Sequence, residues 1–338
     1  MIGQESKVVE RKTVAILKVL SDSPLPIGGR IIARRLSDLG YGLGERAVRY
    51  HLKLMDERGL TQIIGRKDGR LITPAGLDEL KSALVSDRLG YVAARIELLA
   101  YATTFDPERR EGQVPIDISL LPRNELHHAM KLMQKVCHSG FCVSDLVAMA
   151  GEGDQLGELI VPQGKIGLAT VSSVAVSGAL LKAGIPIISR FEGILQLRDH
   201  QPMRFTELVD YSGCSFSPAE VFIAGRMTAV RKACAGGEGR ILASFLEFSA
   251  PCKQGAGTIL ERLRSAGFNG VVRMGEANEL LCEVSTGMNR VGLIVKHGLN
   301  PAAAFAEAGI EVTNRAMGGL IDHRELKSVG ALLERCER

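Results

Sequence analysis

GLGERAVRYHLKLMDERGLTQIIGRKDGRLITPAG, residues 42–76, is the stretch that decides the fold of the N-terminal part of the chain. Val48, Leu52 and Met55 are spaced four and three residues apart, which is the spacing of the buried seam of an α-helix. We predict that this helix ends at Gly59, because glycine readily adopts the left-handed conformation that closes a helix. Two short apolar runs then flank a polar turn bounded by glycines, a pattern typical of a β-hairpin.

The face of this helix opposite the apolar seam is basic. Arginine can bond to guanine or phosphate through two hydrogen bonds, while tyrosine and lysine reach phosphates. A basic helix followed by a basic hairpin predicts a winged helix-turn-helix that binds double-stranded DNA. The alternative is a small helical interaction module whose basic face is only solvated. The candidate DNA contacts are Arg46, Arg49, Tyr50 and Lys53 on the helix and Arg66, Lys67 and Arg70 in the hairpin.

The flanking sequence completes a small N-terminal domain. Residues 7–20 and 30–39 place apolar side chains at helical spacing, and Thr73 is the expected N-cap of a further helix. Residues 1–90 hold 16 Lys and Arg against 11 Asp and Glu, whereas the remainder holds 26 against 27. The basic excess is therefore N-terminal, where a polyanion would bind. We predict a DNA-binding domain over residues 1–88.

The composition indicates a folded, cytoplasmic protein. A length of 338 residues suits two domains, and 46% hydrophobic with 24% charged residues is close to the globular average. No apolar stretch reaches the ~18 residues that a membrane-spanning helix needs, and the chain does not begin with an apolar signal segment. The seven cysteines form no CxxC pair, which argues against a disulfide framework and favours a reducing compartment.

The rest of the chain contains an internal duplication. Residues 164–195 align without gaps on residues 289–320, and nine of the 32 positions are identical. Extended upstream, the match defines two copies of one unit, about 116–195 and 241–320. Two copies predict a mixed α/β or α+β domain with a pseudo-two-fold axis. A small ligand is expected between the halves, because such a groove is concave.

The duplication sets the remaining domain boundaries. We assign residues 89–325 to a regulatory, effector-binding domain and residues 326–338 to a C-terminal tail. At the start of this domain, YATTF (101–105) and VPIDISLL (114–121) flank a polar segment, which predicts a β-hairpin.

Two arginines are candidates for contact with an anionic effector. Arg190 and Arg315 stand at matching positions of the two copies, just beyond the sequence AGI that both copies share. A pair of arginines would suit a dicarboxylate. The alternative for each is an ordinary salt bridge at the end of a strand.

Four further polar residues are candidates for the same site. Ser172 and Ser173 follow an apolar strand, and His297 follows the equivalent strand of the second copy. They could donate hydrogen bonds to an anion, although polar residues are also common in turns. Asn300 could cap a helix whose N-terminus would attract an anion.

The sequence contains no recognisable catalytic constellation. The dinucleotide, P-loop, zinc-protease and serine-hydrolase patterns are absent. The histidines and cysteines between His127 and Cys142 match no zinc spacing, so we expect no metal and no other cofactor. A regulator is predicted, not an enzyme.

Several long motifs carry a family resemblance. The chain resembles the NrpR family of nitrogen-regulatory transcriptional repressors over nearly its whole length, winged helix included. The motifs are GLATVSSVAVSGALLKAGIPIISRFEGIL (167–195), MRFTELVDYSGCSFSPAEVFI (203–223), ILASFLEFSAP (241–251) and GLNPAAAFAEAGI (298–310).

The resemblance implies a homodimeric repressor of nitrogen-assimilation genes, including those for nitrogen fixation and glutamine synthetase. Such a repressor binds palindromic operators and releases them when 2-oxoglutarate accumulates. This effector is a dianion, which suits the pair of arginines. Two alternatives remain: a DNA-binding regulator that responds to a different metabolite or to a protein partner, and, more remotely, a keto-acid enzyme with a DNA-binding appendage.

Overall fold

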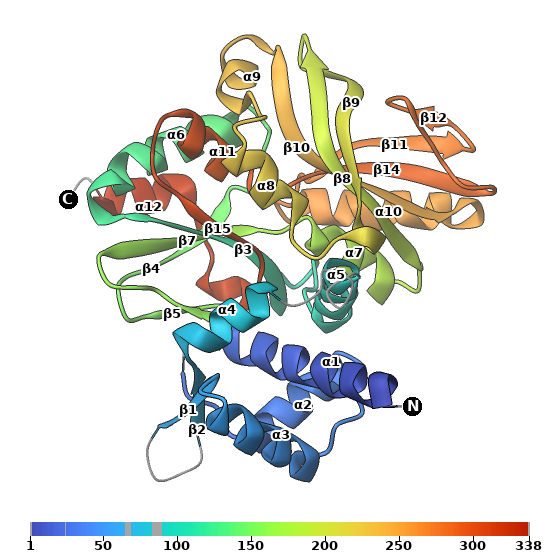
Figure 1. Cartoon of the computed structure of the whole chain (residues 1–338). Coiled ribbons are helices and arrows are strands. Elements are labelled where there is room, and N and C mark those ends of the chain that lie inside the picture. Colours follow the sequence, from blue (N-terminus) through green and yellow to red (C-terminus); the bar gives the residue numbers. More distant parts are fainter. Residues whose placement is uncertain (1, 24, 65–68, 83–89, 337–338) are drawn as a thin grey trace. The chain divides into compact units, whose positions relative to one another are not determined.

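The computed structural model describes residues 2–23, 25–64, 69–82 and 90–336. The chain forms two compact units, residues 1–89 and 90–338 (Figure 1). This division lies next to the boundary predicted after residue 88.

The first unit is a winged helix-turn-helix, as predicted. The buried seam of its third helix is the one expected, because Val48, Leu52 and Met55 are at most 1% exposed. The last helix begins where the Thr73 hydroxyl accepts a hydrogen bond from the Gly76 amide at 3.0 Å, which is the expected N-cap. The elements are α1 (Ile2–Ser21), α2 (Gly29–Asp38), α3 (Glu45–Glu57), the antiparallel hairpin β1 (Thr61–Ile64) and β2 (Gly69–Ile72), and α4 (Pro74–Ser82).

The second unit begins with a helix, α5 (Tyr91–Ala102), so the first arm of the predicted β-hairpin is wrong, whereas its second arm is a strand and an antiparallel bridge joins Asp106 to Glu111. Val92, Ile96 and Leu99 recur every three to four residues and are buried, which is the pattern of a helix that packs on a core. The segment YATTF covers only the end of this helix, and five residues do not distinguish a strand from a helix.

The two copies of the duplicated unit have the same order of elements, which confirms the duplication. The first copy consists of β3 (Gln113–Pro122), α6 (Leu126–His138), β4 (Leu146–Ala150), β5 (Gln155–Leu156), β6 (Leu159–Ile160), β7 (Lys165–Val171), α7 (Val174–Lys182) and β8 (Ile187–Arg198). The second consists of β10 (Gly239–Ser249), α10 (Lys253–Ser265), β11 (Val271–Ala277), β12 (Leu280–Leu281), β13 (Val284–Ser285), β14 (Arg290–Lys296), α11 (Asn300–Glu307) and β15 (Thr313–Asp322). Between them lie β9 (Gln201–Asp210), α8 (Pro218–Ala224) and α9 (Val230–Gly236).

The last strand of each copy joins the sheet of the other copy. One five-stranded sheet has the order β15-β3-β7-β4-β16, where β16 is Lys327–Ser328, and the other has the order β11-β14-β10-β8-β9. Strand β8 of the first copy is therefore paired with β10 of the second, and β15 of the second with β3 of the first. The helices follow the same rule, since α6 contacts α11 and α10 contacts α7. This exchange interlocks the two copies into one unit.

The sequence AGI, identical in both copies, ends a helix in each. In both, the glycine amide donates to the carbonyl three residues earlier and the isoleucine amide to the carbonyl five residues earlier, at 3.0–3.1 Å. Gly184 and Gly309 have φ values of 78° and 87°, which glycine adopts without strain. Ile185 and Ile310 are buried, as expected for this type of helix end.

The C-terminal tail predicted over residues 326–338 is wrong for the residues that the structure describes, up to 336. Leu326 is buried, β16 pairs with β4, and helix α12 (Val329–Cys336) contacts α6. Val329 and Leu332 are 2% and 5% exposed. These apolar side chains complete the core beside α6, so this segment belongs to the second unit.

Cys137 and Cys142 form a disulfide at the turn that follows α6. Their Cα atoms lie 4.9 Å apart, within the range that a disulfide spans. The argument against disulfides is therefore wrong for this pair, because the turn brings two cysteines together that no sequence motif marks. Four other cysteines in the described part are free thiols, namely Cys214, Cys234, Cys252 and Cys282.

Candidate functional site

The predicted DNA-binding helix, α3, presents a basic face to solvent. Arg46, Arg49, Tyr50 and Lys53 are all exposed, and the Tyr50 side chain is 63% exposed. An ion pair of 2.8 Å joins the Arg49 guanidinium to Glu45 one turn earlier. An exposed pair of this kind stabilises little, so this arginine is available to a stronger anion such as a phosphate.

The hairpin that forms the wing is only partly described. Arg66 and Lys67 lie outside the described residues. Arg70 is directed inward, and its Nε lies 2.9 Å from Asp56 with only 11% of the side chain exposed. The prediction that Arg70 contacts DNA is therefore corrected, because this guanidinium ties the wing to α3.

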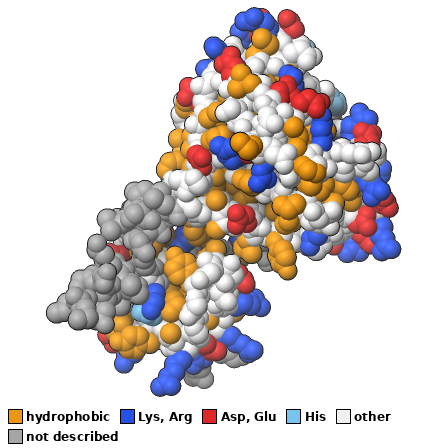
Figure 2. All heavy atoms as spheres, turned by 90° about the vertical axis from the view of Figure 1, so that its right-hand side faces the viewer, with side chains coloured by type: hydrophobic (Ala, Val, Ile, Leu, Met, Phe, Trp, Pro, Cys, Tyr) orange, Lys and Arg blue, Asp and Glu red, His pale blue; other side chains and the backbone are white. Residues whose placement is uncertain are grey.

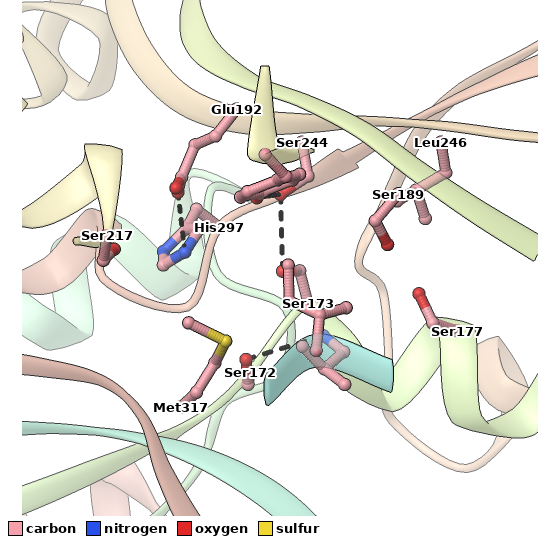
Figure 3. Close-up of a pocket in the computed structure, with 13 residues that line it drawn as sticks. Ser172, Ser173, Ser177, Ser189, Glu192, Ser217, Ser244, Leu246, His297 and Met317 are labelled. Atoms are coloured by element: carbon pink, nitrogen blue, oxygen red, sulfur yellow. Dashed lines mark hydrogen bonds and ion pairs between the residues drawn. The ribbon is translucent and has the colours of Figure 1, made fainter. Parts of the chain in front are cut away.

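A small cavity lies in the second unit where the two sheets meet, and we call it the junction cavity (Figure 3). Its volume is about 10 Å³, which is room for a single water molecule. It is enclosed by polar side chains from both copies and by α5. The lining residues include Ser172, Ser173, Ser177, Ser189, Glu192, Tyr211, Ser217, Ser244, His297 and Met317.

Equivalent positions of the two copies meet at the junction cavity. Ser172 follows β7 as His297 follows β14, and their amides make equivalent hydrogen bonds, to the carbonyls of Pro115 and Leu242 at 2.9 and 3.1 Å. Glu192 on β8 corresponds in the aligned repeats to Met317 on β15. The junction cavity thus lies near the pseudo-two-fold axis that relates the two copies.

His297 and Glu192 form a buried ion pair that joins the two copies. The imidazole Nε2 lies 2.8 Å from Glu192 Oε1, and both side chains are at most 6% exposed. The other ring nitrogen, Nδ1, lies 3.0 Å from the Leu299 amide nitrogen and 3.8 Å from Asp117 Oδ2, and it accepts a hydrogen bond from that amide only while the ring is neutral. The imidazole is therefore enclosed between two carboxylates.

This arrangement shifts the pKa values of the buried groups. Burial by itself lowers the pKa of His297, but Glu192 and Asp117 more than offset it and raise that pKa to about 9. Burial also raises the pKa of Asp117, although His297 and the Met317 amide oppose the shift. Tyr211 is held protonated, because burial and then Glu192 raise the pKa of its phenol.

Hydroxyl groups line the remaining wall of the cavity. Ser244 Oγ lies 3.2 Å from Tyr211 Oη and 3.5 Å from Ser173 Oγ. In the described part of the chain, Ser217 Oγ is buried without a hydrogen-bond partner, and so are Glu192 Oε1 and Asp117 Oδ2, since the ion-pair contacts do not have hydrogen-bond geometry. Buried polar atoms without partners are costly, so this cavity is suited to a polar ligand group.

The structure brings together three of the six predicted effector contacts, Ser172, Ser173 and His297. Arg190 and Arg315 are not among the residues that line the cavity. Arg190 lies 2.7 Å from Glu247, which agrees with the salt-bridge alternative. Arg315 lies near Glu220, where it opposes the rise that burial causes in the pKa of that carboxyl group. The prediction of a paired-arginine site is therefore corrected.

Asn300 has a structural role instead of the predicted contact with the effector. Its Oδ1 accepts a hydrogen bond from the Leu242 amide at 2.8 Å, and its Nδ2 donates to the Phe141 and Leu242 carbonyls. The residue is fully buried. Both donor hydrogens are thus bonded to the main chain, and none is free for a ligand.

Sequence reasoning missed Glu192, Asp117, Tyr211 and Ser244. The missed signal lay in the repeat alignment, where a buried-strand position holds glutamate in one copy and methionine in the other. A charged side chain that replaces an apolar one at an equivalent buried position needs an ion-pair or hydrogen-bond partner.

A larger groove of about 430 Å³ lies among α6, α9 and α11. Lys135, His138 and Arg231 stand at its rim, while Leu132, Val136 and Ala304 form its floor. The three basic side chains are exposed to water. This groove is an alternative site for a small anion.

The described residues place further limits on chemistry and location. They include no group of three or more His, Cys, Asp or Glu side chains arranged to hold a metal ion. None of the described helices combines the length and the apolar character that crossing a membrane requires. On the face shown in Figure 2, acidic and basic side chains of the second unit are interspersed, whereas a nucleic-acid surface gathers basic ones.

A winged helix with an exposed basic helix, joined to a larger duplicated unit, is typical of a DNA-binding regulator with a second domain. Comparison with known families agrees. Residues 89–328 match the family described as NrpR regulatory domains NRD1 and 2, and residues 14–80 match the ribonuclease R winged-helix domain. The chain belongs to the NrpR family of nitrogen regulators and takes part in nitrogen-related transcriptional regulation.

Characterised relatives share most of this chain. It is 38% identical to the global nitrogen regulator NrpRI of Methanosarcina mazei over 95% of this chain and 98% of that protein. It is 34% identical to the global nitrogen regulator NrpR of Methanocaldococcus jannaschii over 88% of this chain, but spans only 51% of that relative. These names are those of regulators, in agreement with the prediction that the chain is not an enzyme.

One solved structure has the same fold as a large part of this chain. The crystal structure of a nitrogen repressor-like protein from Methanococcus jannaschii matches with a TM-score of 0.60, at 22% identity over 71% of this chain and 98% of that one. At this identity the match supports the fold alone.

Proposed function

We propose that this protein represses nitrogen-assimilation genes by binding palindromic operator DNA as a homodimer, and that 2-oxoglutarate releases it. The observation that carries the proposal is the exposed basic face of α3, which lies opposite a buried apolar seam in a winged helix. That arrangement holds Arg46, Arg49, Tyr50 and Lys53 on one side of a rigid helix. A helix of this kind enters the major groove, where arginine reads guanine and lysine contacts phosphate.

A homodimer explains how a short helix would select an operator. Two winged helices related by a two-fold axis bind two half-sites of a palindrome, and the second half-site doubles the number of base contacts. The relatives named global nitrogen regulators support the choice of nitrogen genes as targets.

The junction cavity is the proposed site at which the sensor recognises its effector. Ser172, Ser173 and His297 line it and can donate hydrogen bonds to a carboxylate. With room for a single water molecule, the cavity must open before an effector enters. Effector and operator would then favour different conformations, and each would weaken the binding of the other by the same factor.

Operator binding measured with and without 2-oxoglutarate at one stated salt concentration tests the proposal. We expect a palindromic promoter fragment to be bound, and millimolar 2-oxoglutarate to weaken its binding at least tenfold, an effect of about 1.4 kcal/mol. Succinate serves as a control for charge. Unchanged binding in 2-oxoglutarate would reject this effector and favour a regulator of the same class that answers to another metabolite or to a protein.

A further inference from the structure

We infer that the Nε2 side of His297 is a carboxylate-binding subsite that Glu192 fills from within the protein. A ligand carboxylate would bind there by displacing the Glu192 carboxylate, which acts as an internal competitor. The inference rests on the proposed function for the identity of the ligand, but the subsite itself is defined by this chain alone.

The contacts of the two side chains support a subsite. Among the described residues that line the junction cavity, His297 is the one basic side chain, and Glu192 Oε1 lies 2.8 Å from its Nε2. The contact does not have the direction of a good hydrogen bond, and Glu192 Oε1 has no other hydrogen-bond partner. The carboxylate is thus held by charge and enclosure, and a carboxylate free to orient itself would bind better. In Figure 3 Glu192 reaches His297 across the cavity from β8.

The internal duplication shows that the fold does not need a carboxylate at this position. Met317 occupies the equivalent position in the second copy, where it lies beside Ser172, the equivalent of His297. The second copy therefore has a neutral side chain where the first has Glu192, although the Met317 amide donates to the buried carboxylate of Asp117 at 2.8 Å. Burying the Glu192 carboxylate costs desolvation that methionine avoids, so a glutamate at this position is better explained by a ligand than by stability.

The surrounding charges explain why a ligand must replace Glu192 and cannot join it. Asp117 lies on the other side of the imidazole, with its Oδ2 3.8 Å from Nδ1, and Glu220 lies near enough to act on the same ring. Tyr211 adds a phenol that stays protonated. Three carboxyl groups around one imidazole already exceed its charge. A further anion in the closed cavity would be repelled, whereas a ligand carboxylate that takes the place of the Glu192 carboxylate, while the Glu192 side chain turns out to solvent as the cavity opens, leaves the charge beside His297 unchanged.

Calorimetric titration of the whole protein with 2-oxoglutarate gives the first test. Glu192→Gln keeps the side-chain volume and removes the competing charge, so we expect binding tighter by on the order of tenfold. His297→Gln should abolish binding. Glu247→Gln is the matched control, because Glu247 is also a buried, ion-paired glutamate but does not line the cavity. The proposal that Glu192 is an internal competitor would be overturned if the unsubstituted protein binds 2-oxoglutarate and Glu192→Gln binds it no more tightly.

Rescue with acetate gives a second test that does not depend on 2-oxoglutarate. Glu192→Ala empties the carboxylate position, so sodium acetate should raise its thermal unfolding temperature above that in sodium chloride of equal ionic strength. The unsubstituted protein and Met317→Ala should show no such difference. Equal unfolding temperatures of Glu192→Ala in the two salts would overturn the subsite.

Acetate rescue without 2-oxoglutarate binding would leave the subsite standing and reject the proposed effector. Should Glu192→Ala not fold, acetate binding by Glu192→Gln, measured by calorimetry against the same chloride control, decides the question.

Discussion

The buried charge contacts at the junction cavity centre on one side chain, that of His297. The imidazole is 6% exposed and stands between Glu192 and Asp117, one from each sheet. Each of these contacts is made across the interlocked copies. A change in the protonation of this one ring therefore alters how firmly the copies hold together.

Stability is expected to depend on pH through His297. Its folded-state pKa of about 9 lies above the unfolded value near 6.5, so its contribution is complete below about pH 6.5 and is lost as the pH rises through 9. The raised pKa of Asp117 acts in the same direction. Urea unfolding at pH 6.5 and pH 9 should show a loss on the order of 2 kcal/mol that His297→Gln largely removes.

The comparison with His297→Gln is needed because Lys296 titrates nearby. Burial lowers the pKa of Lys296 from 10.5 to about 8, and this shift makes stability rise with pH above about 8, where His297 also titrates. Both the unsubstituted protein and His297→Gln contain Lys296, so the contribution of Lys296 cancels when their pH dependences are subtracted. A variant that keeps the full pH dependence would show that His297 does not carry it.

Arg49 and Lys53 are expected to make different kinds of contact with DNA. Arg49→Ala should cost about 1–3 kcal/mol on the operator and relax its specificity at one base pair, because arginine reads guanine. Lys53→Ala should weaken binding to all sequences alike and reduce the salt slope by about one. Fluorescence anisotropy at several salt concentrations measures both.

Arg58→Ala is the matched control for these two variants. Arg58 is an exposed arginine with an ion pair like that of Arg49, but it lies at the C-cap of α3, beyond the turns that carry Arg49 and Lys53. We expect it to bind operator like the parent protein. If all three variants bound alike, α3 would not be the recognition helix.

At the scale of single elements, the two copies keep the residues that end helices and vary those that fill the cavity. Gly184 and Gly309 close α7 and α11 with the same hydrogen bonds and both have positive φ. Ser172 and His297, at equivalent positions, differ. Backbone geometry has therefore been retained in both copies, while the side chains at the junction have diverged.

Gly309→Ala is expected to destabilise the second unit by about 1–2 kcal/mol. A Cβ at this position meets no atom within 4 Å, so the cost comes from the left-handed conformation, with φ at 87°. Gly330→Ala in α12 is the matched control, because its Cβ also meets no atom but its φ is not positive. There alanine should be neutral or slightly stabilising, since it favours a helix. If Gly309→Ala and Gly330→Ala changed the thermal unfolding temperature equally, the left-handed conformation would not explain the glycine of the shared AGI.

At the scale of the whole second unit, the exchange of strands makes the two copies interdependent. Sheet β15-β3-β7-β4-β16 lacks its edge strand β15 without the second copy, and β8 keeps only β9 as a paired strand without β10. Neither copy can therefore bury its own core. The unit should unfold in one cooperative step, as most tightly coupled domains do.

Splitting the chain in the two-residue link between α9 and β10 tests this interdependence. Residues 90–236 and 237–338, produced together, should associate and be purified as one complex through a tag on either piece. Each piece produced alone should aggregate, because its exchanged strand leaves an apolar sheet edge open. Two pieces that are each soluble and show native circular dichroism would disprove the interlocked arrangement.

Local sequence determined the winged helix, the duplication and the helix ends. The spacing of Val48, Leu52 and Met55, the cap at Thr73 and the shared AGI each depend on neighbours within a few residues, so periodicity and turn chemistry were enough to predict them. The same local reasoning failed at α5 and at α12. There, short apolar runs are compatible with more than one structure until packing selects one.

Only the tertiary structure decided which strands exchange and which side chains meet at the junction cavity. Glu192 reaches His297 because β8 of the first copy lies in the sheet of the second, and no local pattern marks that choice of partner. Arg190 and Arg315 match in the alignment, but Arg190 is paired with Glu247 on the neighbouring strand β10, whereas Arg315 lies near Glu220 of helix α8. Strand pairing across the chain is set by the burial of whole sheets, and the sequence of one segment does not contain it.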